Sequence, residues 1–125
     1  MKRLDIAMGW LLIAFGVAHT SFTRRVDPNI GMNAIWFASG GLLMITIGTL
    51  NLLRVAYSSV ARGVYVVSVM ANIVLVLLML LIATRLPMRS NPQVLVGLLL
   101  AALLTAFSVL RRAGRSQARQ AQSAK

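Results

Sequence analysis

The sequence predicts an all-α integral membrane protein, an antiparallel up-and-down bundle of four transmembrane helices. Hydrophobic residues make up 58% of the 125 residues and charged residues only 12%, far from the soluble average of about half apolar and a quarter charged. The segment 63–84 carries no charged residue. At about 1.5 Å of rise per residue it makes a helix of about 33 Å, enough to cross a hydrocarbon core of about 30 Å. The basic residues fall between such apolar runs, as topology signals at membrane borders do.

The first predicted span covers residues 4–22, because no charged residue occurs from 6 to 23 and about 18 apolar residues just span a bilayer. A cleaved signal peptide is the alternative, since two basic residues precede the run and the small residues at 16–18 could form a cleavage site. Asp5 within the basic region, and an apolar run that continues past the small residues, favour an uncleaved span. Cleavage would leave three spans.

Three more spans follow, separated by short polar connections. The segment 27–29, Asp-Pro-Asn, has the residues of a tight turn after the first span. Two prolines within 85–92 end the third span, because proline lacks the N–H that a helix needs. Neighbouring helices joined by short connections run antiparallel. The remaining predicted spans are 32–53, 63–84 and 93–110, and residues 1–110 form one transmembrane domain.

The C-terminal residues 111–125 contain no apolar residue larger than alanine, so we expect a basic cytoplasmic tail that is disordered or, as the alternative, loosely helical at the membrane surface. Arg111, Arg112 and Arg115 are candidates for contacts with anionic lipid headgroups. With four spans, the N-terminus, the second connection and the tail share one side and hold nine of the 13 basic residues. That side is predicted to face the cytoplasm, and the membrane to be a cell inner membrane.

The net charge of +11 would suit a nucleic-acid partner if the basic residues formed one face with aromatic residues between them. They are spread along the borders of the spans instead, so we expect no nucleic acid and take the lipid bilayer as the first partner. A homo-oligomer, or a complex with another membrane protein, is the expected assembly.

Small residues recur at helical spacing on the spans, which is typical of packing between helices in lipid. The first and second spans share a Gly-x6-Gly spacing, which would indicate an inverted repeat but also arises by chance in leucine-rich sequence. The predicted packing positions are Gly9, Gly16, Gly41, Gly48, Gly97 and Ala101.

Two polar positions are predicted within the membrane on the cytoplasmic side and at its centre. Asp5 lies at the predicted inner border, where Arg54 or Arg62 would neutralise its carboxylate. Asn72 is the deepest strong hydrogen-bonding group and is predicted near the midplane. An interhelical bond of about 1 kcal/mol would account for Asn72, and ligand binding is the alternative.

The only histidine, His19, is the leading candidate for ligand binding. Asn33 and Trp36 are predicted to lie level with it at the outer border and are candidates as well. His19 could ligate a metal or haem iron, accept a proton from a quinol or bind a lipid headgroup, or simply bond to Asn33 or a backbone carbonyl. Because the chain has no second histidine, no cysteine and no glutamate, we predict no metal site and no cofactor.

The sequence contains no P-loop and no nucleophile paired with a base, so no catalytic residue is predicted. We favour a non-enzymatic accessory or assembly protein that binds another membrane protein through its small-residue stripes. The first alternative is a small transporter or channel subunit, acting as an oligomer with a polar path through Asn72 and His19. The second is a haem-, quinone- or lipid-binding membrane protein that uses His19.

Overall fold

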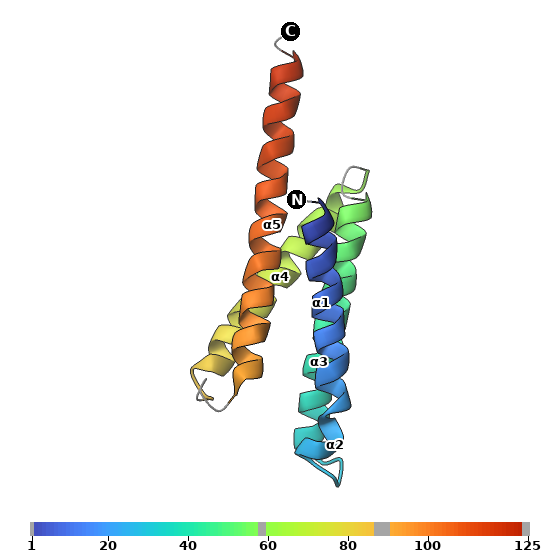
Figure 1. The fold of residues 1–125 in the computed structure, drawn as a ribbon, viewed down its shortest axis with the longest axis vertical. Helices are drawn as coiled ribbons and strands as arrows, with labels where there is room; N and C mark the ends of the chain where they lie inside the picture. Colours follow the sequence, from blue (N-terminus) through green and yellow to red (C-terminus); the bar gives the residue numbers. More distant parts are fainter. Residues whose placement is uncertain (1, 58–59, 87–90, 124–125) are drawn as a thin grey trace.

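The computed structural model describes residues 2–57, 60–86 and 91–123, with side chains described as far as residue 110. The described residues are helical apart from their short connections, and they form no strand. Four of the helical segments are long and apolar enough to cross a membrane. This confirms the predicted all-α class and the predicted number of span-length helices. The helices are α1 (Lys2–Ser21), α2 (Thr23–Val26), α3 (Met32–Tyr57), α4 (Arg62–Ala83) and α5 (Pro92–Ser123) (Figure 1).

Two helices extend further than the sequence indicated. The helix α3 continues past Arg54 to Tyr57, so the arginine lies inside the helix and does not end it. The helix α5 runs beyond residue 110 as far as Ser123, in line with the helical alternative for the tail and not with the disordered one. Alanine, arginine and glutamine are good helix formers, and adding a residue to an existing helix avoids the cost of nucleation.

The connection between α2 and α3 is a tight turn built around Asp27. Its carboxylate accepts the backbone N–H groups of Asn29 at 3.1 Å and Gly31 at 2.9 Å. Ile30 has a φ of 52°, in the left-handed region that a β-branched residue rarely adopts. The two bonds from the Asp27 carboxylate hold the turn in this shape.

The long helices are arranged as two pairs. Along one pair, α1 packs against α3, and along the other, α4 packs against α5. Figure 1 shows that the two pairs lie together near the N-terminus of α1 and diverge toward the end that carries α2. This divergence positions the candidate site described below.

Glycines bring the backbones of α1 and α3 into contact. A Cβ added to Gly16 would lie 2.6 Å from the carbonyl oxygen of Gly41, and one added to Gly48 would lie 2.9 Å from that of Gly9. Side chains larger than hydrogen cannot occupy this contact without moving a helix. In lipid, where apolar surfaces gain nothing by leaving the solvent, such close approach is a main source of helix association.

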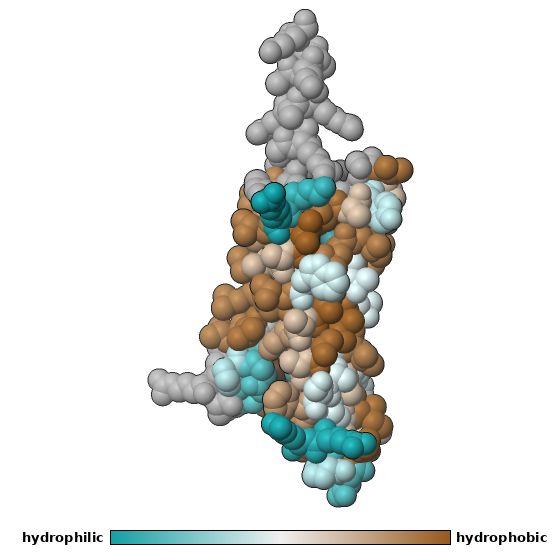
Figure 2. Space-filling model, turned by 45° about the vertical axis from the view of Figure 1, so that its right-hand side comes forward, coloured by the Kyte–Doolittle hydropathy of each residue, from teal (hydrophilic) through white to brown (hydrophobic). Residues whose placement is uncertain are grey.

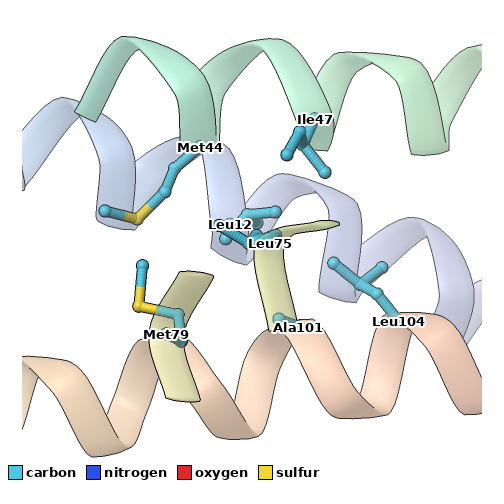
Figure 3. Close-up of a cluster of buried hydrophobic side chains, with 7 residues drawn as sticks. All are labelled: Leu12, Met44, Ile47, Leu75, Met79, Ala101 and Leu104. Carbon is cyan, nitrogen blue, oxygen red and sulfur yellow. The ribbon is translucent and has the colours of Figure 1, made fainter. Parts of the chain in front are cut away.

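An apolar core joins the two pairs at mid-height (Figure 3). All four long helices contribute to it, and its side chains are at most 6% exposed. On the face that Figure 2 shows, a broad hydrophobic band lies between hydrophilic patches toward the two ends of the bundle. The core residues are Leu12, Met44, Ile47, Leu75, Met79, Ala101 and Leu104.

Candidate functional site

Polar side chains from all four long helices meet on the N-terminal side of the apolar core, toward the top of the view in Figure 1. We call this group the polar network. Each member is at most 1% exposed. Ionisable and polar groups buried at membrane depth are rare, and they are candidates for function by default. Its members are Asp5, Asn51, Arg54, Ser68, Asn72 and Ser108.

An ion pair links α1 to α3 in the polar network. Nη2 of Arg54 donates to Oδ1 of Asp5 at 2.5 Å. The guanidinium also lies 3.3 to 3.4 Å from Oδ1 of Asn51, one turn earlier on α3. The structure therefore brings Asp5 together with Arg54, whereas Arg62, the other predicted partner, is exposed at the start of α4.

Amide and hydroxyl groups continue the polar network from α3 to α4 and α5. Asn51 and Asn72 form two reciprocal hydrogen bonds, of 2.7 and 3.0 Å, through their side-chain amides. Asn72 also donates to the hydroxyl of Ser108 at 3.4 Å. On α4, the hydroxyl of Ser68 lies 2.9 Å from the carbonyl oxygen of Leu50 on α3. Asn72 thus lies beside Asn51 of α3 and Ser108 of α5.

The polar network is best explained as a structural joint. Its opposite charges are paired, and its amides satisfy one another. A satisfied network fixes the register of the helices that contribute to it, because any shift would leave a buried donor or acceptor without a partner.

A cleft lies on the opposite side of the apolar core, where the two helix pairs diverge. It has a volume of about 200 Å³, is only partly enclosed, and is lined almost entirely by apolar side chains. All four long helices contribute to its lining. We call it the His19 cleft; its lining residues are Phe15, His19, Trp36, Phe37, Gly40, Leu43, Met44, Leu78, Met79, Ile82, Leu86, Gln93 and Val94.

His19 is the ionisable group of the cleft that bears its name. Its ring stacks on Phe37 of α3, with ring centroids 3.8 Å apart and planes inclined by 19°. Phe15, one turn earlier on α1, approaches the same ring at 6.4 Å. Gly40 leaves room beside the imidazole, since a Cβ placed there would lie 3.6 Å from Nε2. The imidazole is therefore half-buried and held in place by aromatic contacts from two helices.

The structure brings only some of the predicted ligand-binding residues together. His19 and Trp36 both line the cleft, and the Trp36 side chain is 71% exposed. Asn33 is exposed and is not among the lining residues. Asn72 lies in the polar network, with Leu75 of the apolar core one turn closer to the cleft.

The predicted packing residues are covered by the chain's own helices. Gly9, Gly16, Gly41 and Gly48 lie between α1 and α3, and Ala101 is part of the apolar core. Gly97 faces Met79 and Phe15, with a Cβ placed there 3.1 Å from the sulfur of Met79. These stripes therefore hold the monomer together and do not form a free surface for another protein. The side chains of Arg111, Arg112 and Arg115 lie outside the described residues.

On each long helix the apolar core lies between the cleft residues and the polar network. On α3 the cleft residues 36–44 precede Ile47 of the apolar core and then Asn51 and Arg54 of the polar network. The order reverses on α4 and reverses again on α5, as expected where successive helices change direction. Within the described residues, the apolar core thus separates the cleft from the polar network, and no polar path joins His19 to Asn72.

Comparisons of the chain with protein-family models, with curated proteins and with solved structures found no match.

Proposed function

We propose that this chain is a four-span membrane protein that binds a membrane lipid in the His19 cleft. The observation that carries the proposal is the cleft itself, an apolar hollow between two helix pairs with a single ionisable side chain in its lining. Most ligand sites are concave and apolar, with a few polar groups that orient the ligand. Lipid is the most abundant molecule of that chemistry inside a bilayer.

The proposed setting is an antiparallel bundle in a cell inner membrane, with both termini in the cytoplasm. The support is the broad hydrophobic band between hydrophilic ends (Figure 2), together with the four span-length helices. The excess of basic residues on the side of the termini supports this orientation. In this arrangement the polar network lies toward the cytoplasm and the His19 cleft toward the outer surface.

The size of the cleft favours an acyl chain over a larger ligand. Sites for drug-sized molecules have volumes of roughly 300 to 1,000 Å³, whereas this cleft has about 200 Å³. One flexible chain fits such a hollow, while a haem macrocycle would require the helix pairs to move further apart. The lining includes Met44 and Met79, whose unbranched side chains adapt to irregular apolar partners.

Native mass spectrometry of the protein in mild detergent tests the proposal. We expect lipid to remain bound to the wild-type chain. Gly40→Leu places a larger side chain in the cleft, so we expect it to lose the bound lipid. Gly63→Leu is the matched control, because a Cβ at Gly63 meets nothing within 4 Å.

The spectra also contain the results that would contradict the proposal. Equal lipid retention by the two leucine variants would show that the retained lipid is not in the cleft. A bound haem or quinone that Gly40→Leu displaces would replace lipid as the ligand.

The same spectra report whether copies of the chain or another membrane protein remain attached. An assembly role has a separate surface to use, because exposed hydroxyl residues follow one face of α3. Each of them bonds to a carbonyl oxygen of its own helix at 2.8 to 2.9 Å, so a neighbouring helix could approach closely without leaving a polar group unsatisfied. These residues are Ser39, Thr46 and Thr49.

A further inference from the structure

We infer that the lipid in the His19 cleft is an anionic phospholipid, with one acyl chain between the helix pairs and its phosphate at the arginine-rich rim. The inference rests on the proposed function and adds the chemistry of the headgroup. It is drawn from the direction of the cleft and from the charges at its open end.

The cleft has an apolar end and a polar end. Met44 and Met79 line it where it meets the apolar core, and both belong to that core. Toward the outer surface, its lining includes Trp36 and Gln93, near the start of α3 and the start of α5. Tryptophan is enriched at the level of lipid headgroups. An amphiphile therefore fits in one direction only, with its chain toward the methionines and its headgroup toward the border.

Three exposed arginines lie close in sequence to residues that line the cleft. Arg85 directly precedes Leu86, which lines the cleft, and Arg24 and Arg25 lie on α2, shortly after His19. The side chains of all three arginines are exposed. Guanidinium groups suit phosphate, because their planar set of donors matches its oxygens.

The acidic group nearest in sequence does not cancel this charge. Asp27 is the only acidic residue between His19 and the end of the chain. Both of its carboxylate oxygens accept backbone N–H groups, from Asn29 and Gly31, within its own turn. Arg24, Arg25 and Arg85 carry three positive charges against the single negative charge of Asp27, and this excess favours an anionic headgroup over a zwitterionic one.

The two tryptophans of the chain allow a test at the cleft itself. Trp36 lines the cleft, and Trp10 is 59% exposed on α1 without lining it. In Trp10→Phe the tryptophan fluorescence comes from Trp36 alone. In Trp36→Phe it comes from Trp10 alone, which contacts lipid outside the cleft. Both variants are reconstituted in phosphatidylcholine vesicles with increasing fractions of brominated phosphatidylglycerol or brominated phosphatidylcholine, and quenching gives the relative affinity for each lipid.

We expect the Trp36 reporter to prefer phosphatidylglycerol and the Trp10 reporter to show no preference. Arg85→Gln should lower the preference at Trp36 by about five-fold, the effect of removing one basic residue near an anionic lipid. Arg3→Gln, at the other end of the bundle, should leave it unchanged. Gly40→Leu should abolish the preference.

Two results would overturn the inference, and each separates it from the proposed function. Equal quenching of Trp36 by the two lipids, with lipid still lost on Gly40→Leu in the mass spectra, leaves a lipid site without headgroup selection. If the preference for phosphatidylglycerol is the same at Trp10 and Trp36, the whole protein surface and not the cleft selects the lipid. The same conclusion follows if Arg85→Gln does not change the preference at Trp36. A wild-type chain that retains no lipid in the mass spectra would contradict the proposed function itself.

Discussion

Arg54 is one of the largest fully buried side chains among the described residues, and its charge is balanced by Asp5 from another helix. A buried ion pair adds little net stability, because removing both groups from water costs about as much as their attraction returns. Removing one partner is strongly destabilising, since water does not reach the buried charge that remains. The pair therefore makes each of its members hard to replace alone.

We expect Arg54→Leu to lower the free energy of unfolding by about 3 to 5 kcal/mol, because the buried Asp5 carboxylate would lose its ion pair with Arg54. The measurement is unfolding in mixed micelles with increasing dodecyl sulfate, followed by circular dichroism. Arg62→Leu is the control; its exposed side chain should change the stability by less than about 0.5 kcal/mol. The double variant Asp5→Leu, Arg54→Leu should be more stable than Arg54→Leu, and a less stable double variant would contradict the pairing.

Sequence alone could show that Asp5 needs a cation but not which one. Arg54 and Arg62 both follow the second apolar run, and the expected end of that span at residue 53 placed both in a connection. The helix continues to Tyr57 because nothing between Arg54 and Tyr57 breaks it, and this puts Arg54 on the inward face of α3. Helix ends are hard to predict from sequence, since they depend on packing as much as on local propensity.

At the scale of the helices, α1 and α3 are held together by backbone contact at paired glycines. Gly9 faces Gly48 and Gly16 faces Gly41, so equal spacing on the two helices allows both contacts to form at once. The Gly-x6-Gly spacing that the two spans share is thus required by packing, whether or not the spans have a common origin. The predicted packing role of these glycines rested on composition, whereas their partners depend on the direction and register of the two helices.

We expect Gly41→Ala to destabilise the protein by about 1 to 3 kcal/mol, because overpacking forces the helices apart. The added Cβ would lie 2.7 Å from the carbonyl oxygen of Gly16 and 2.9 Å from the amide nitrogen of Thr20. Gly63→Ala is the control; its Cβ meets nothing within 4 Å, and alanine favours helix by up to about 1 kcal/mol. The same micelle unfolding assay compares them, and equal stability of the two variants would contradict the close contact.

At the scale of the whole molecule, the two helix pairs are joined at one end and diverge at the other. The polar network ties α1 and α3 to α4 and α5 near the N-terminus, and the His19 cleft occupies the opposite end. Apolar pattern and charge were sufficient to predict the four long helices. The cleft could not be predicted, because it results from the angle between two pairs, which no single segment encodes.

The proposed orientation makes a prediction for the intact membrane, and the absence of native cysteine simplifies its test. Lys2→Cys and Ser116→Cys should be protected from a membrane-impermeant maleimide in whole cells, because both positions would face the cytoplasm. Asn29→Cys, in the connection between α2 and α3, should react. Protection is measured by mass shift before and after permeabilisation. Reaction of only one of the two terminal cysteines would rule out an even number of spans.

The apolar core has an electrical consequence for the cell. Its seven side chains come from all four long helices and fill the middle of the bundle with hydrocarbon (Figure 3). An ion that entered from either surface would have to shed its water there, at a cost of many kcal/mol. In the proposed orientation, most of the transmembrane voltage would fall across this layer, and the Asp5–Arg54 pair would stay close to the potential of the cytoplasm. Even at high copy number, the protein should leave the proton gradient of its host intact.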